Sequence, residues 1–192
     1  MEKDYQERDS YKKIVESATA LFSTKGYRGT TIKDITAGAG LAVGTFYLYF
    51  KSKHELYADI MENFARGLQK HLDGCGAGIE DVVERQVQYI ISFIRYAFEN
   101  PACYNLIFES LYIDKKLFFD YYHKYAMRYV PFIAKSPDMS KEINPAVWSY
   151  ISMGIGNFLG FKVIAEDDCS EEQLKIIEDT IRKILEEGIR VD

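Results

Sequence analysis

Residues 30–53, TTIKDITAGAGLAVGTFYLYFKSK, decide how the rest of this chain is interpreted. The stretch predicts a short helix, a tight glycine turn, a second short helix and the start of a third. Thr31 can cap the first helix, with Asp34 three residues later in a capping-box position. Residues 37–40 are all alanine or glycine, and a glycine there can take the positive φ that a turn between closely packed helices needs.

The second short helix is expected over residues 42–48. Val43, Phe46 and Phe50 are spaced for burial on one face. A further helix follows, with Ser52 as its N-cap and Glu55 at its N3 position. The positions left to face outward are Gly44, Thr45, Tyr47 and Tyr49. Two short helices with a glycine turn, the second exposing small and aromatic polar residues, are typical of a helix-turn-helix DNA-binding motif.

The composition is that of an ordinary globular protein with uneven charge. Hydrophobic residues make up 47% of the 192 residues and only four are proline, and apolar residues recur at helical spacing, which favours an all-α fold. The net charge of −5 argues against a protein that coats nucleic acid or anionic membrane by charge alone. Residues 1–56 nevertheless carry +2 and the remaining 136 residues −7. A basic head on an acidic body fits local contact with phosphate.

Neither the N-terminus nor the cysteines predict export. The first ten residues are charged throughout and lack the apolar segment of a secretory signal. Cys75, Cys103 and Cys169 are odd in number and far apart, without CxxC spacing, so free thiols are expected. The expected location is the cytoplasm.

About nine helices are predicted, in two domains. The glycine-rich residues 74–78 mark the expected boundary region. The DNA-binding domain is placed at residues 1–56, continuing into a connecting helix 53–73, and the second domain at 57–192. The other helices are expected over residues 10–26, 79–99, 102–113, 116–133, 146–165 and 171–188, with breaks at prolines and loops.

The opening stretch resembles the N-terminal signature of TetR/AcrR-family transcriptional regulators. The resemblance covers roughly residues 14–56, through ATALF (18–22), KGYRGTTIKDIT (25–36) and AGLAVGTFYLYFKSKHELY (39–57). The run G-T-F-Y-x-Y-F-x-S-K at residues 44–53 is highly specific for that family. One departure is Thr36, where family members often have Ala. The resemblance implies three DNA-binding helices followed by a divergent helical body that binds a ligand and dimerises.

The resemblance places a recognition helix at residues 42–49. Thr45 is expected to contact a base edge or a nearby phosphate, and Gly44 to let the backbone approach the DNA. Tyr47 and Tyr49 would supply hydroxyls to phosphates, and Lys53 an ammonium beside a helix N-terminus. The remaining predicted contacts are Arg28, Thr31, Lys33 and the apolar Val43. Thr31 is a cap with or without DNA, and Arg28 and Lys33 are alternatively plain solvated charges.

The helical body is expected to bind a small molecule and a second copy of the chain. Its aromatic density exceeds what a core requires and suggests a cavity for a flat or apolar effector, with core packing as the alternative for each residue. The predicted pocket residues are Tyr89, Phe93, Tyr96, Tyr104, Phe108, Tyr112, Tyr122, Tyr125, Trp148 and Phe158, with Asn105, Glu109 and Asn157 to orient the ligand. The resemblance places the last two helices in a four-helix dimer interface, with Gly154, Gly156, Gly160, Ile177, Ile181 and Ile184 as its predicted residues.

Other kinds of site find little support. His54-Glu55 begins like H-E-x-x-H, but the fifth residue is Ala58, so no metal site and no cofactor are predicted. The glycines from residue 154 to 160 do not have dinucleotide-binding spacing. Residues 146–165 are long enough to span a bilayer. Polar residues within them, and the lack of a second such segment, favour a buried helix instead.

The sequence therefore predicts a homodimeric, ligand-responsive transcriptional regulator, a repressor and not an enzyme, that binds a palindromic operator. Its two heads would contact half-sites one DNA turn apart, roughly 34–36 Å. The alternative is a helical module that binds a partner protein or a membrane, with a DNA-binding head that has no regulatory role. Specific, salt-sensitive binding to a palindromic duplex would distinguish the two.

Overall fold

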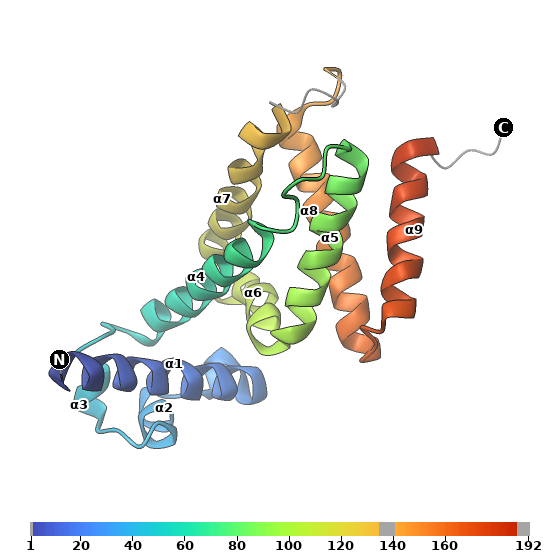
Figure 1. Cartoon of the computed structure of the whole chain (residues 1–192). Helices are drawn as coiled ribbons and strands as arrows, with labels where there is room; N and C mark the ends of the chain where they lie inside the picture. The colour runs from blue at the N-terminus through green and yellow to red at the C-terminus, as the bar shows by residue number, and fades with distance from the viewer. Residues whose placement is uncertain (1, 135–140, 188–192) are drawn as a thin grey trace. The chain divides into compact units, whose positions relative to one another are not determined.

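The computed structural model describes residues 2–134 and 141–187, and the side chains of residues 8–131, 133–134 and 141–187 (Figure 1). Every regular element in these ranges is a helix, which confirms the predicted all-α class and the count of about nine. The helices are α1 (Glu2–Gly29), α2 (Ile32–Gly38), α3 (Val43–Phe46), α4 (Lys53–Leu72), α5 (Val82–Glu99), α6 (Pro101–Ile113), α7 (Lys115–Ala134), α8 (Pro145–Glu166) and α9 (Glu171–Glu187).

The helices form two compact units, which are described separately. The first unit comprises Met1–Ala65 and Ala102–Phe119, and the second Arg66–Pro101 and Asp120–Asp192. α6 therefore groups with the N-terminal helices. This division by packing does not test the predicted functional boundary at residues 56 and 57, which stays a prediction.

Two helix boundaries differ from the sequence-based expectation. α1 begins at Glu2 instead of residue 10, and it continues beyond Gly26 through a kink at which Gly26 has φ 71° and ψ 165°. α3 is a single turn that ends at Phe46, followed by turn residues 47–49. The predicted end of the last helix, residue 188, lies outside the described residues.

The core of the first unit is formed by α1, α2, α3, the start of α4 and α6. Phe22, Tyr27 and Tyr57 form an aromatic cluster with ring centroids 5.2–5.6 Å apart. The buried Tyr57 hydroxyl donates to the Leu106 carbonyl of α6 at 2.5 Å. α1 and α2 are joined by the Ser17 hydroxyl, which donates to the Ile35 carbonyl at 2.8 Å.

In the second unit α5 packs against both α8 and α9 (Figure 1). α8 begins directly after Asn144, whose side chain accepts from the amides of Ala146 and Val147. Pairs of charged residues link α5 to α9: Arg182 to Glu84 at 2.7 Å and Arg95 to Glu171 at 2.7 Å. The buried apolar core between these helices consists of Val87, Ile90, Ile91, Ile94, Val163, Leu174, Ile177 and Ile181.

Hydropathy along the described helices was compared with what a bilayer span requires. None of them, α8 included, is both long and apolar enough to cross a membrane.

The Tyr57 hydroxyl gives a direct test of the α4–α6 packing. Tyr57→Phe removes this hydrogen bond and leaves the Leu106 carbonyl with its helical partner alone, which should cost about 0.5–1.5 kcal/mol and lower the Tm by several degrees. Tyr112→Phe is the matched control, because Tyr112 lies on α6 of the same unit and is 78% exposed. Thermal unfolding followed by circular dichroism measures both variants. Equal Tm values for the two would contradict a structural role for the Tyr57 hydroxyl.

Candidate functional site

The N-terminus of α2 is fixed by a reciprocal capping box, as the sequence predicts. The Asp34 amide donates to the Thr31 hydroxyl oxygen at 3.1 Å, and the Thr31 amide donates to the Asp34 carboxylate at 2.9 Å. The hydrogen bonds that the Thr31 hydroxyl and the Thr31 amide donate to the Asp34 carboxylate lower the pKa of Asp34. The Thr31 hydroxyl also donates to this carboxylate at 2.6 Å. Its proton is therefore already engaged before any DNA is bound.

The turn and α3 present a short exposed surface. Gly40 has φ 67° in the turn between α2 and α3. Phe46 and Phe50 are buried, whereas Val43 is 43% exposed, so its predicted burial is wrong. Because α3 is only one turn long, the i, i+3 spacing of Val43 and Phe46 does not place both on one buried face.

Leu48 is an exposed residue of this surface that is not among the DNA contacts predicted from the sequence. Its side chain is 79% exposed. The signal was present in the sequence: when Phe46 and Phe50 are both buried, the residue midway between them faces away from the core. Leu48 therefore adds an apolar side chain to a surface that already contains Val43.

Gly44, the second residue of α3, has no packing reason to be glycine. A Cβ placed on it would meet nothing within 4 Å, and its φ lies outside the left-handed region. Alanine would fit at this position and would favour the helix. No contact within the described residues accounts for the missing side chain.

Lys53 holds the beginning of α4 against the end of α1. Its ammonium donates to the carbonyls of Tyr27 and Thr30, each at 2.6 Å, and lies 4.2 Å from the centroid of the Tyr27 ring. Burial lowers the pKa of this ammonium, and the Glu109 carboxylate opposes the change. Two of its three N–H groups are thus used inside the head, which leaves one for the predicted phosphate contact.

The other predicted DNA contacts differ in accessibility. Arg28, Lys33 and Tyr47 are exposed, and Thr45 is half-buried. Tyr49 is also half-buried, with its ring 6.2 Å from that of Tyr11 and 6.5 Å from that of Phe50. The structure thus gathers most of the predicted residues around α3, while Tyr49 has a packing role as well.

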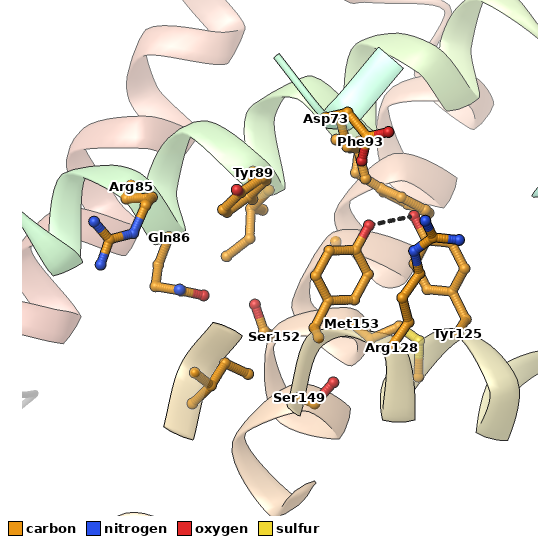
Figure 2. Close-up of a pocket in the computed structure, with 15 residues that line it drawn as sticks. Asp73, Arg85, Gln86, Tyr89, Phe93, Tyr125, Arg128, Ser149, Ser152 and Met153 are labelled. Atoms are coloured by element: carbon orange, nitrogen blue, oxygen red, sulfur yellow. Dashed lines mark hydrogen bonds between the residues drawn. The ribbon is translucent and has the colours of Figure 1, made fainter. Parts of the chain in front are cut away.

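The second unit contains a cavity of about 470 Å³ (Figure 2). Of the ten predicted pocket residues, Tyr89, Phe93 and Tyr125 line it. Arg85, Gln86 and Arg128 also line it and were not predicted, because charged and amide side chains on a helix are ordinarily solvated. Their position in Figure 2 shows a pocket with more polar groups than the aromatic sequence suggests.

The remaining predicted pocket residues lie outside the cavity lining. Trp148 donates from its indole to the Gln86 side chain, and Tyr122 donates to Asn157. Tyr96 lies over Gly67, where a Cβ would come within 2.1 Å of its hydroxyl oxygen. The residues found in the core of the first unit or on the surface are Tyr104, Phe108, Tyr112 and Phe158.

The polar residues expected to orient a ligand also have other positions. Glu109 accepts from the Tyr27 amide at 2.8 Å and from the Tyr57 hydroxyl at 3.4 Å, so it belongs to the first unit. Asn105 is exposed on α6. Asn157 is buried and donates to the Met153 carbonyl at 2.7 Å. The Glu109 carboxylate and the Asn157 side-chain amide, both predicted to contact a ligand, therefore form hydrogen bonds within the protein instead.

Four of the six predicted interface residues face the interior of their own chain. Ile177 and Ile181 are buried in the core around α5, and Gly160 is buried as well. At Gly156 the backbone of α8 lies close to the Phe93 ring of α5, because a Cβ on Gly156 would be 3.1 Å from that ring. These small and apolar residues let α8 and α9 approach α5, which corrects their assignment to a partner. Ile184 is exposed and Gly154 half-buried.

An exposed apolar surface is nevertheless present on α8 and α9. Phe158 is 77% exposed. On α8 the exposed positions are separated by four, seven and three residues, which places them on one helical face. In the sequence, this face consists of the apolar residues of α8 that remain once those facing the core are set aside. The residues of this α8 face are Val147, Ile151, Phe158 and Phe161, and α9 exposes Ile176 and Ile184.

Possible metal ligands were also searched for in the described ranges. These ranges contain no group of three or more His, Cys, Asp or Glu side chains that could hold a metal ion. Cys75, Cys103 and Cys169 are free thiols.

Known proteins resemble the chain most clearly in its N-terminal part. Residues 14–60 match the profile of the family described as "Bacterial regulatory proteins, tetR family". The chain is 27% identical over 118 residues to YttP of Bacillus subtilis, covering 60% of this chain and 57% of YttP. It is 35% identical over 71 residues to the HTH-type transcriptional repressor KstR2 of Mycobacterium tuberculosis, covering 37% and 32%. The chain thus spans between 32% and 57% of these relatives' lengths.

Solved structures extend the likeness in fold to nearly the whole chain. The transcriptional regulator FadR from Bacillus subtilis, in complex with stearoyl-CoA, has a TM-score of 0.74 at 16% identity, covering 94% of this chain and all of FadR. PfmR from Thermus thermophilus, a TetR family transcriptional regulator, has a TM-score of 0.71 at 18% identity, covering 92% and 99%. Residues 14–60 therefore match the helix-turn-helix profile of the tetR family, and nearly the whole chain shares its fold with these solved regulators.

Proposed function

We propose that this protein is a ligand-responsive transcriptional repressor that binds a palindromic DNA operator as a homodimer. The observation that carries the proposal is the exposed α3 surface, held by the α2 capping box and the Lys53 contacts within the matched residues 14–60. A rigid single-turn helix with exposed Val43 and Tyr47 and an unobstructed Gly44 suits insertion into a major groove. Relatives named as repressors, KstR2 and DhaR, support repression.

The exposed face of α8 and α9 supports the homodimer. It gathers six large apolar residues on two adjacent elements, which is more than scattered surface residues would give. A twofold axis through it would pair each helix with its copy and bring two heads to one palindrome. The interface residues proposed here are therefore the exposed ones, together with Gly154, and not the buried Ile177 and Ile181.

The cavity of the second unit supports a small-molecule effector. Its volume of about 470 Å³ lies within the range of roughly 300–1,000 Å³ that is usual for ligand sites. That FadR was solved with stearoyl-CoA shows that this fold can hold a ligand. A regulator of this kind acts on DNA in the cytoplasm and needs no catalytic residues or cofactor. The alternative, a helical partner-binding module, gives no reason for the vacant space around Gly44.

Removal of the two polar α3 side chains tests the DNA surface. Thr45→Ala combined with Tyr47→Ala should weaken binding by roughly 30-fold or more, since each lost base or phosphate contact costs about 1–3 kcal/mol. Fluorescence anisotropy measures the affinity for a duplex that wild-type protein has enriched from a random pool. Thr24→Ala with Tyr112→Ala is the matched control, because both residues are exposed and neither lies on α3. Wild-type affinity in the α3 variant would show that these side chains do not contact DNA.

Gly44→Ala separates DNA contact from folding. Alanine should stabilise the protein by up to about 1 kcal/mol, because it favours the helix and meets no neighbour. Its methyl group should also keep the backbone away from the DNA and weaken operator binding. Thermal unfolding and anisotropy on the same preparation measure the two effects. A variant that is more stable and binds DNA as tightly as wild type would rule out close backbone approach at Gly44.

Phe158→Glu tests the dimer surface. A carboxylate on this exposed apolar face cannot be desolvated against a partner, so the protein should become monomeric and bind the operator weakly. Sedimentation velocity measures the oligomeric state. Tyr112→Glu is the control, because Tyr112 is 78% exposed, as Phe158 is 77%, and lies on α6. Dimers that persist in Phe158→Glu but not in Tyr112→Glu would move the interface to the first unit.

A further inference from the structure

The cavity wall in the second unit carries two arginines, which lie at opposite sides of the lining in Figure 2. Arg85 and Arg128 line it, and Asp73 is its single acidic residue, so the formal charge of the lining is +1. The Arg128 guanidinium donates to the Gln69 side chain. A guanidinium has five N–H donors, so this bond leaves most of them for a ligand. Among the described residues no carboxylate forms an ion pair with Arg128.

Two tyrosine hydroxyls lie within reach of the same charge. The Tyr129 hydroxyl donates to the Tyr125 hydroxyl oxygen at 3.3 Å, the bond drawn in Figure 2. Either hydroxyl can donate in this pair, and the other then keeps its own proton for a further acceptor. Burial raises the pKa of both phenols, with Arg128 close enough to oppose the change. Both hydroxyls are therefore protonated donors at neutral pH.

The rest of the cavity wall is mostly apolar. Ile90 and Phe93 line it from α5, Ile133 from α7 and Met153 from α8. The Gln86 side chain accepts the Trp148 indole N–H at 3.3 Å, so its oxygen is already used. Likewise the Ser149 hydroxyl donates to the Ala126 carbonyl at 2.7 Å. The Gln86 oxygen and the Ser149 hydroxyl thus already have partners within the protein.

We propose that the effector is an amphipathic carboxylate, with its anionic group at Arg128 and Tyr125 and its apolar chain against Phe93 and Met153. The proposal rests on the proposed function only in calling this ligand the effector. A cationic group at this place would face the Arg128 guanidinium, and a purely apolar ligand would cover Arg128 and Tyr125 without replacing their hydrogen bonds to water. A carboxylate accepts from both, in the charge-assisted geometry that arginine favours. This proposal adds an anionic group to the flat or apolar effector that the aromatic residues predict.

The only tryptophan of the chain reports on this site directly. Trp148 is bonded to Gln86, which lines the cavity, so a ligand there should change its fluorescence. Octanoate, decanoate and dodecanoate are titrated without DNA, below their micelle-forming concentrations, beside the alcohols of equal chain length. At least one carboxylate should bind about tenfold or more tightly than its alcohol, the effect expected for a charged hydrogen bond. Alcohols that bind as tightly as the carboxylates, or no binding by any carboxylate, would overturn the proposal.

Arg128→Gln locates the anion. It should weaken carboxylate binding about tenfold or more and leave alcohol binding unchanged, because only the charged contact is lost. Lys124→Gln is the matched control: it removes the same charge one turn earlier on α7, outside the cavity lining. Unchanged carboxylate affinity in Arg128→Gln would overturn the assignment. If that variant binds neither ligand class, Tyr125→Phe decides, with a selective loss of carboxylate supporting the proposal and wild-type affinity refuting it.

The fluorescence titration tests the ligand class, and the DNA-binding assay tests the response to ligand, so the two proposals can be contradicted independently. A carboxylate that binds at Arg128 but does not release DNA contradicts the proposed response to ligand and leaves the ligand class supported. Release of DNA by an alcohol as readily as by its carboxylate keeps the repressor function and overturns the ligand class.

Discussion

The first unit depends on how two oppositely charged side chains hold the peptide groups of Tyr27. Lys53 of α4 binds the Tyr27 carbonyl, and Glu109 of α6 accepts from the Tyr27 amide. The left-handed Gly26 makes this possible, because a Cβ there would lie 3.3 Å from the Glu109 carboxylate in a conformation that side chains rarely adopt. The link between α1 and α2 is thereby fixed from two sides. The direction of α2, and with it the exposure of α3, follows from that constraint.

A corresponding constraint in the second unit is that α8 must serve two apolar faces. On one face Gly156 lets the Phe93 ring of α5 approach, and Val163 is fully buried. On the other, Phe158 and its neighbours remain exposed. A helix that is apolar all round is compatible with a core, a partner or a bilayer. The two faces together explain its hydropathy without a membrane.

The sequence predicted the local features well and the distant contacts poorly. The capping box at Thr31 and the burial of Phe46 and Phe50 depend on residues a few positions apart, so spacing was sufficient. Tyr104 and Glu109 were assigned to a pocket because helical periodicity shows which face is apolar but not which helix covers it. Grouping of α6 with the first unit decided their role. Arg128 was missed because a charged residue on a helix is ordinarily solvated, and only the tertiary structure shows the cavity beside it.

Charge therefore has two different roles in this chain. In the proposed DNA contact, the net +2 over residues 1–56 would act on a polyanion at long range, and salt would screen this interaction. The remaining residues carry −7, which repels anions at long range. An anionic effector must then gain its affinity from short-range contacts with Arg128 and Tyr125 inside a partly desolvated cavity, where screening is weaker. For the proposed anionic effector, the cationic Arg128 inside an acidic body would confine favourable anion contacts to the cavity itself.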